Sequence, residues 1–165
     1  RWLHLNRLRS ADGLKLPEHV GGGLDLEGLT SAEGLKLPEH VGGDLNLSGL
    51  TSAEGLKLPK RVGGRLILIG LTSAEGLKLP EHVSRDLFLI GLKSAEGLKL
   101  PEHVGEGIHL WSLDPDEYDQ KVHGPAELGG EIHFSDPDEE EEEGPPPSGA
   151  PPRSDQVLIQ PLNQP

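Results

Sequence analysis

Leucines recur along most of this chain in a fixed pattern with a period of 21 residues. The unit is clearest as LTSAEGLKLPEHVGGDLNLSG over 29–49. Near-identical copies begin at Leu8, Leu29, Leu50, Leu71 and Leu92. A repeat this short cannot enclose a core by itself, so neighbouring copies must stack and bury a continuous apolar column. The sequence therefore predicts a repeat solenoid.

Within each unit, apolar and polar residues alternate twice, which is the pattern of short β-strands. In one unit the alternating leucines are Leu35 with Leu37 and Leu45 with Leu47. We therefore expect a mainly β fold of five to six 21-residue coils with stacked parallel strands.

Turn-forming residues separate the two predicted strands of each unit. Pro38 and the pair at 42–43 predict corners, because proline removes a ladder donor and glycine adopts turn conformations. Val41 is expected to fill one corner from inside. The TSAEG segment predicts a tight turn or a single helical turn.

Three regions follow from this pattern. Residues 1–112 are the predicted repeat solenoid, 113–135 a degenerate sixth coil or C-terminal cap, and 136–165 a disordered acidic and Pro-rich tail. The motif LGGEIHFS at 128–135 aligns with VGGDLNLS at 41–48. The last aliphatic cluster, Val157 to Ile159, is either an idle end or a short linear motif.

The net charge of −13 is concentrated at the C-terminal end: residues 113–165 carry 2 Lys or Arg against 14 Asp or Glu. This asymmetry argues against nucleic acid as a partner. Cysteine is absent, which excludes disulfides and thiolate ligands, and no stretch reaches the roughly 20 apolar residues of a membrane span. The chain begins within a truncated repeat and has no Met, which suggests a fragment or processed product, so localisation stays open.

The segments LPE at 37–39, LNLS at 45–48 and LTS at 50–52 resemble short bacterial leucine-rich repeats, over roughly residues 3–112. The resemblance implies a curved scaffold that binds partners with its strand face; some such proteins are secreted by pathogens into host cells. The Asn that this family places after L-x-L-x-x is leucine here, at Leu29, Leu50, Leu71, Leu92 and Leu113. A straighter two- or three-sided β-solenoid is therefore an equal alternative, and both imply a parallel β stack.

The copies differ mostly at the outward positions of the second strand, which are Asp25 and Glu27, Asn46 and Ser48, Ile67 and Ile69, Phe88 and Ile90, and His109 and Trp111. If the intervening leucines point inward, strand alternation places these side chains outward. The apolar ones would form a patch of about 300–500 Å², a size typical of partner sites. The alternatives are mutual support along the ladder, and cover by a missing N-terminal part or by the tail.

A second candidate is the histidine column His19, His40, His82 and His103, which Arg61 interrupts. Imidazoles one coil apart suggest a transition-metal site or a pH-dependent surface, but copying of the unit also explains them. The DPDE segments at 114–117 and 136–139 are weak candidates for calcium, since they lack the spacing of an EF-hand loop.

The sequence predicts a non-enzymatic scaffold that binds a protein partner through Ile67, Ile69, Phe88, Ile90, His109 and Trp111. No cofactor or catalytic residue is expected, because the carboxylates and imidazoles lie on repeating ladders without a convergent pocket. The alternative is a structural stalk or self-associating segment, and a distant third is a polysaccharide-binding or polysaccharide-active β-helix.

Overall fold

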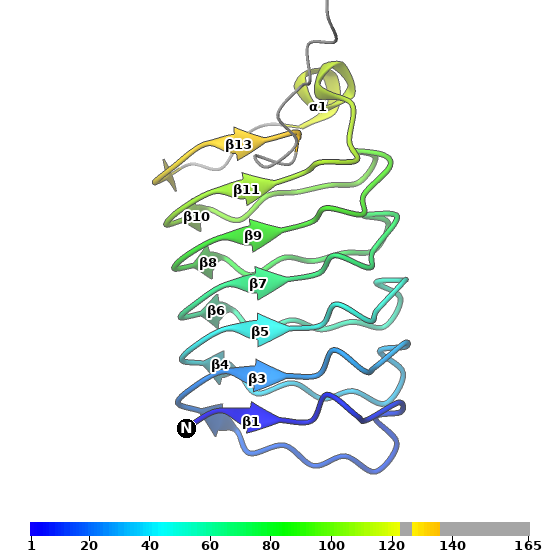
Figure 1. Ribbon diagram of the computed structural model, residues 1–165, viewed down its shortest axis with the longest axis vertical. Helices are drawn as coiled ribbons and strands as arrows, with labels where there is room; N and C mark the ends of the chain where they lie inside the picture. Colours follow the sequence, from blue (N-terminus) through cyan, green and yellow to red (C-terminus); the bar gives the residue numbers. More distant parts are fainter. Residues whose placement is uncertain (123–126, 136–165) are drawn as a thin grey trace, which may run out of the picture.

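The chain forms a parallel β-solenoid of about six coils in its computed structural model, which describes residues 1–122 and 127–135 (Figure 1). Two parallel sheets run along the stack, one behind the other in Figure 1. The predicted disordered tail, 136–165, lies outside the described residues. The predicted domain limits at 112 and 135 stay a prediction.

The front sheet, here sheet A, has seven two-residue strands in stacking order: β1 (Leu3–His4), β3 (Leu24–Asp25), β5 (Leu45–Asn46), β7 (Leu66–Ile67), β9 (Leu87–Phe88), β11 (Ile108–His109) and β13 (Ile132–His133). The rear sheet, sheet B, has six: β2 (His19–Val20), β4 (His40–Val41), β6 (Arg61–Val62), β8 (His82–Val83), β10 (His103–Val104) and β12 (Glu127–Leu128).

The coils are held in register by backbone hydrogen bonds between successive strands. Leu45 pairs with Leu66, and Leu66 with Leu87, so equivalent residues of each unit stack directly. The N–H of Leu66 donates to the Asp86 carbonyl at 3.0 Å, and the N–H of Leu68 donates to the Phe88 carbonyl at 2.9 Å. The side chains of each ladder position therefore form straight columns along the stack.

The predicted position of the first strand in each unit is wrong. The strand of sheet B falls on the His-Val pair, such as His40–Val41, and not on Leu35 with Leu37. The Leu35 N–H donates within its own coil to the Ala32 carbonyl at 3.0 Å, and Pro38 has no N–H to donate. Val41 is fully buried, but it fills the core from a strand and not from a corner.

The interior consists of aliphatic columns with alanine where the chain turns tightly. Leu24, Leu26 and Leu29 have no exposed surface, and the same holds for their equivalents in the next three coils. Alanines of the TSAEG turn are also buried. In each turn a serine hydroxyl accepts from the N–H two residues on, as Ser52 does from Glu54 at 3.1 Å. The core therefore runs unbroken through the repeats.

The C-terminal end departs from the repeat by a short helix, α1 (Pro115–Lys121), at the top of the stack in Figure 1. Asp114 caps it by accepting from the Asp116 N–H at 2.9 Å. One oxygen of Glu117 accepts from the Ser94 hydroxyl at 2.8 Å and from the Ala95 N–H at 3.2 Å. These bonds attach the helix to the preceding turn.

Both sheets continue beyond the helix. Leu128 pairs with Val104 in sheet B, and Ile132 pairs with Ile108 in sheet A. This register is the one expected from aligning LGGEIHFS with VGGDLNLS. The Tyr118 ring is buried and packs edge-on against Phe134, with ring centroids 5.3 Å apart.

Candidate binding strip on sheet A

Strand alternation determines which side chains of sheet A face outward. Leu66 and Leu68 are fully buried, whereas Ile67 is half-buried and Ile69 is 40% exposed. Phe88 and Ile90 are likewise half-buried beside the fully buried Leu87 and Leu89. The expected inward and outward orientations are therefore confirmed by burial.

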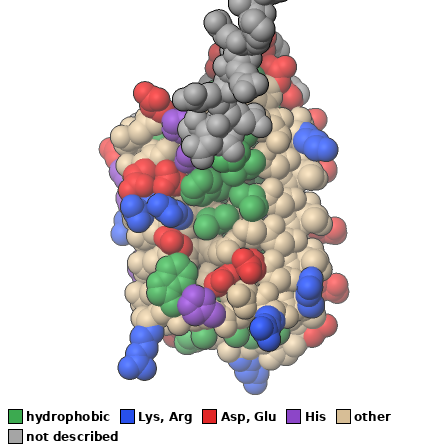
Figure 2. Space-filling model, viewed as in Figure 1, with side chains coloured by type: hydrophobic (Ala, Val, Ile, Leu, Met, Phe, Trp, Pro, Cys, Tyr) green, Lys and Arg blue, Asp and Glu red, His purple; other side chains and the backbone are tan. Residues whose placement is uncertain are grey.

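Six side chains predicted to bind a partner lie together on this face, and we call them the strip: Ile67, Ile69, Phe88, Ile90, His109 and Trp111. They occupy two neighbouring columns. Ile67 pairs with Phe88, and Phe88 with His109. Ile69, Ile90 and Trp111 follow two residues later in the same three coils. Figure 2, which looks onto sheet A, shows hydrophobic side chains gathered on this face.

Aromatic rings stack along the first column at the C-terminal end of the strip. The Phe88 and His109 rings are nearly parallel with centroids 4.3 Å apart, and the His109 and His133 rings lie 4.9 Å apart. Trp111 meets His109 edge-on at 6.0 Å. These ring contacts stabilise one another along the stack, which agrees with the alternative of mutual support along the ladder.

The strip is less open than the sequence suggested. Ile69 is its one exposed residue, and the other five are half-buried. Trp2, at 53% exposed, is the only other large hydrophobic side chain in the described part of the chain that is as open. The strip is therefore a shallow apolar surface with Ile69 as its most accessible side chain.

His109 is held by Asp86 of the preceding coil. Its Nε2 lies 3.3 Å from Asp86 Oδ1, and its side chain is only 13% exposed. Partial burial raises the pKa of Asp86, but hydrogen bonds from the Gly107 N–H and the His109 ring outweigh it and hold that pKa below its usual value. His109 Nδ1 and Trp111 Nε1 are buried without a hydrogen-bond partner among the described residues.

Charged side chains line one flank of the strip. Arg65 Nε lies 3.4 Å from Asp86 Oδ2, and Arg85 Nε lies 3.0 Å from Glu106 Oε1. The hydrogen bond with Glu106 raises the pKa of the Arg85 guanidinium. Both arginines keep about half of their side chains exposed, at 44% and 50%. The apolar surface is thus bordered by paired charges, as partner surfaces commonly are.

The same face is polar at β3 and β5, next to the exposed Trp2 that stacks on His4 at the N-terminal end of the sheet. The Asn46 amide donates to Asp25 Oδ1 at 3.2 Å, and Asn46 Oδ1 accepts from the Ser48 N–H at 3.1 Å. Aliphatic side chains replace this network from Ile67 onward. One continuous sheet therefore has a polar half and an apolar half.

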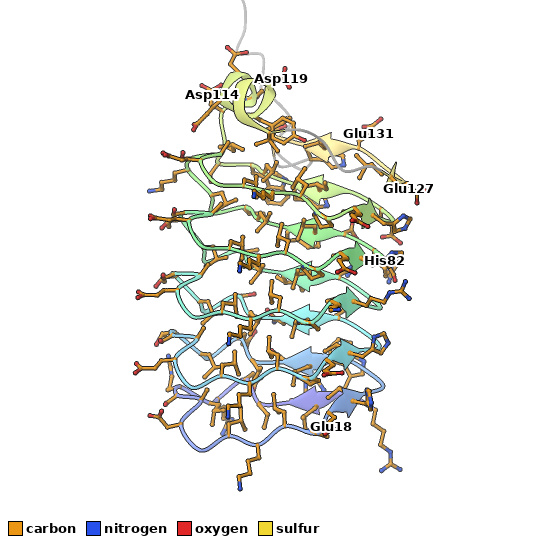
Figure 3. All side chains as sticks on the ribbon, turned by 180° about the vertical axis from the view of Figure 1, so that it is seen from behind. Glu18, His82, Asp114, Asp119, Glu127 and Glu131 are labelled. Carbon is orange, nitrogen blue, oxygen red and sulfur yellow. The ribbon has the colours of Figure 1, made fainter. Side chains whose placement is uncertain are left out.

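The histidine column forms on sheet B, seen from behind in Figure 3, where His82 and Glu127 are labelled. His19 pairs with His40, and Arg61 separates His40 from His82. The His82 and His103 rings stack at 4.2 Å with planes 7° apart, and His103 Nδ1 lies 2.9 Å from Glu127 Oε2.

This stacking does not suit a shared metal ion. Zinc binds in the plane of an imidazole at about 2.0–2.1 Å from nitrogen. Because the His82 and His103 rings are stacked and nearly parallel, an ion that lies in the plane of one ring lies outside the plane of the other. Across residues 1–122 and 127–135, no group of three or more His, Asp or Glu side chains is placed to hold a metal.

We expect His82 to make stability fall on acidification. Burial, His103 and Arg61 lower the pKa of His82 below 6.5. The unfolded chain therefore binds the proton more tightly than the folded chain, so the stability contribution is full above pH 6.5 and is lost as pH falls toward the folded pKa. Thermal unfolding of His82→Gln should show a smaller loss of midpoint temperature between pH 7.5 and pH 5.5 than the parent. Equal losses would contradict this assignment.

The first DPDE segment has a structural use. Asp114 caps helix α1 and Glu117 bonds to Ser94 and Ala95, so two of its carboxylates already have protein partners. The second segment, 136–139, lies outside the described residues. The calcium hypothesis thus gains no support from the first segment.

A hollow of about 660 Å³ lies away from the strip, on the side of the TSAEG turns. It lies between two successive turns and is lined by residues of 51–55 and 72–76. Its lining residues are the same in both units, so it carries none of the variation that distinguishes the strip.

Two contacts of the site were not foreseen in the sequence. Asp86 precedes its strand and bonds to His109 of the next coil, and His133 extends the aromatic column. The alignment of 128–135 with the repeat contained the signal for His133, because it places His133 directly after His109 in the ladder. No pattern within one unit pairs Asp86 with His109, because the contact joins different ladder positions.

Comparisons with protein-family models, with curated proteins and with solved structures find no match. The resemblance to leucine-rich repeats therefore stays a prediction. Within the described residues, no helix has the length and apolar character needed to cross a membrane.

Proposed function

We propose that this solenoid is a non-enzymatic scaffold that binds a protein partner through the strip. One observation supports the proposal: the units differ mostly at the outward positions of sheet A, where three successive coils carry aliphatic or aromatic side chains. Residues that only maintain the stack are repeated from unit to unit. The strip lies on the part of the surface where the coils differ most.

The shape of the surface supports a protein partner. A row of apolar side chains on a parallel sheet, bordered on one flank by ion pairs, is a flat surface. Protein interfaces combine an apolar centre with a polar rim, whereas small molecules favour enclosed cavities. Phe88 and Trp111 supply aromatic side chains of the kind enriched at the centres of interfaces.

We expect Phe88→Thr with Ile90→Thr to weaken partner binding by about 30-fold, the equivalent of about 2 kcal/mol for the loss of central interface side chains. The full chain and this double variant would be used to capture proteins from a cell extract. Affinities for the purified captured protein would then be measured by calorimetry.

The matched control is Asp25→Thr with Glu27→Thr, which makes the same change of residue type at equivalent positions of the polar half. The control should bind as the parent does. Equal binding by the parent and both variants would refute the strip as the site.

A structural role is the second candidate. Near-identical coils stacked in strict register make a straight rod, and the same strip would then join copies of the chain. Light scattering separates the two functions. A mass that rises with concentration in the parent, and not in the Phe88 and Ile90 variant, favours self-association.

A further inference from the structure

The described part of the chain ends beside the strip. His109 pairs with His133, so Ser135 stands level with Trp111 in the neighbouring coil. Thirty residues, 136–165, follow Ser135 in the sequence. Their first residue is therefore attached at the C-terminal end of the strip.

This C-terminal segment contains one run of adjacent aliphatic residues, Val157 to Ile159. Twenty-two residue steps separate Ser135 from Val157. They span at most about 70–80 Å when fully extended. The strip covers three coils, which is on the order of 10 Å between the first and the last. The aliphatic run is thus attached close enough to reach every side chain of the strip.

We propose that Val157 to Ile159 docks on the strip of the same molecule and competes there with the protein partner. The strip offers the contact it needs, because Ile69 is 40% exposed and lies between the half-buried Ile67 and Ile90. Apolar surface on both sides is removed from water by this contact. The proposal rests on the proposed function for the competing partner, but the docking itself involves this chain alone.

The size of the strip favours its own segment over a second copy as occupant. A stable interface between two proteins buries about 800 Å² on each partner. Six side chains, of which only Ile69 is exposed, provide much less apolar surface than that, so a protein partner or a second copy would also have to bury polar surface beside the strip, such as its charged flank. A tethered segment needs less contact area, because the tether gives it an effective concentration on the order of millimolar.

The test uses the isoleucine methyl groups of the full chain. Ile67, Ile69 and Ile90 lie in the strip, while Ile108 is fully buried in the core and reports on folding. Changing Val157, Leu158 and Ile159 together to Ser should shift the methyl signals of the three strip isoleucines and leave Ile108 unchanged. The control variant, Gln156→Ser with Gln160→Ser, flanks the run and should shift none of them.

Unchanged strip signals in the triple variant would overturn the proposal. The parent would also be measured after tenfold dilution. If its signals then approach those of the triple variant, the contact joins two molecules and the proposal is overturned. The result is separable from the proposed function. If the strip signals shift but no partner is captured, the scaffold function is refuted and the docking is supported. If a partner is captured but the strip signals do not shift, the docking is refuted and the scaffold function is supported.

Discussion

Leu68→Ala is expected to lower the free energy of unfolding by about 2–5 kcal/mol, the range for a leucine removed from a packed core. Leu68 has no exposed surface and lies between Leu47 and Leu89 in an unbroken column. A cavity in this middle coil weakens its contacts with both neighbouring coils. In a solenoid those contacts between neighbours carry the stability of the whole stack.

The matched control is Ile69→Ala, one residue away on the opposite face. Ile69 is 40% exposed, and we expect its change to cost less than about 1 kcal/mol, as for surface positions. Urea unfolding followed by circular dichroism would give both values, with the slope against urea checked for two-state behaviour. Equal losses at the two positions would contradict the inward orientation of Leu68.

The period-2 pattern of the second strand was enough to predict sheet A and the orientation of its side chains. Alternating residues such as Leu66, Ile67 and Leu68 allow only two orientations, and the repeated leucines identify the buried one. The candidate site was predictable for the same reason. Its members are the residues that vary where the neighbouring leucines do not.

The position of sheet B was not predictable from that pattern. A strand such as His40–Val41 is followed by a glycine pair and not by a second alternating leucine, so no alternation marks it. Leu35 and Leu37 show alternation but form no strand, because proline follows and Leu35 bonds within its own turn. Apolar alternation reports which side chains are buried, whereas a strand also requires backbone partners.

Gly70→Ala is expected to destabilise the fold by about 3 kcal/mol or more, at the upper end of the cost of overpacking. The added methyl group would meet the backbone carbonyl oxygens of Ser48 and Leu50 in the preceding coil. Backbone cannot move aside as a flexible side chain can. The change therefore forces two coils apart, at a position next to the hydrogen bonds that hold sheet A together.

Gly76→Ala separates this effect from the general preference of a turn for glycine. Gly76 has a φ of +71°, and an added methyl group there meets nothing within 4 Å. Its cost is the conformational one alone, about 1 kcal/mol. The midpoint temperature of thermal unfolding should be much lower for Gly70→Ala than for Gly76→Ala. Because Gly28, Gly49 and Gly91 meet the same carbonyl positions, alanine at Gly49 should cost as much as at Gly70. The opposite ranking would mean that moving two coils apart costs less free energy than placing alanine in the turn.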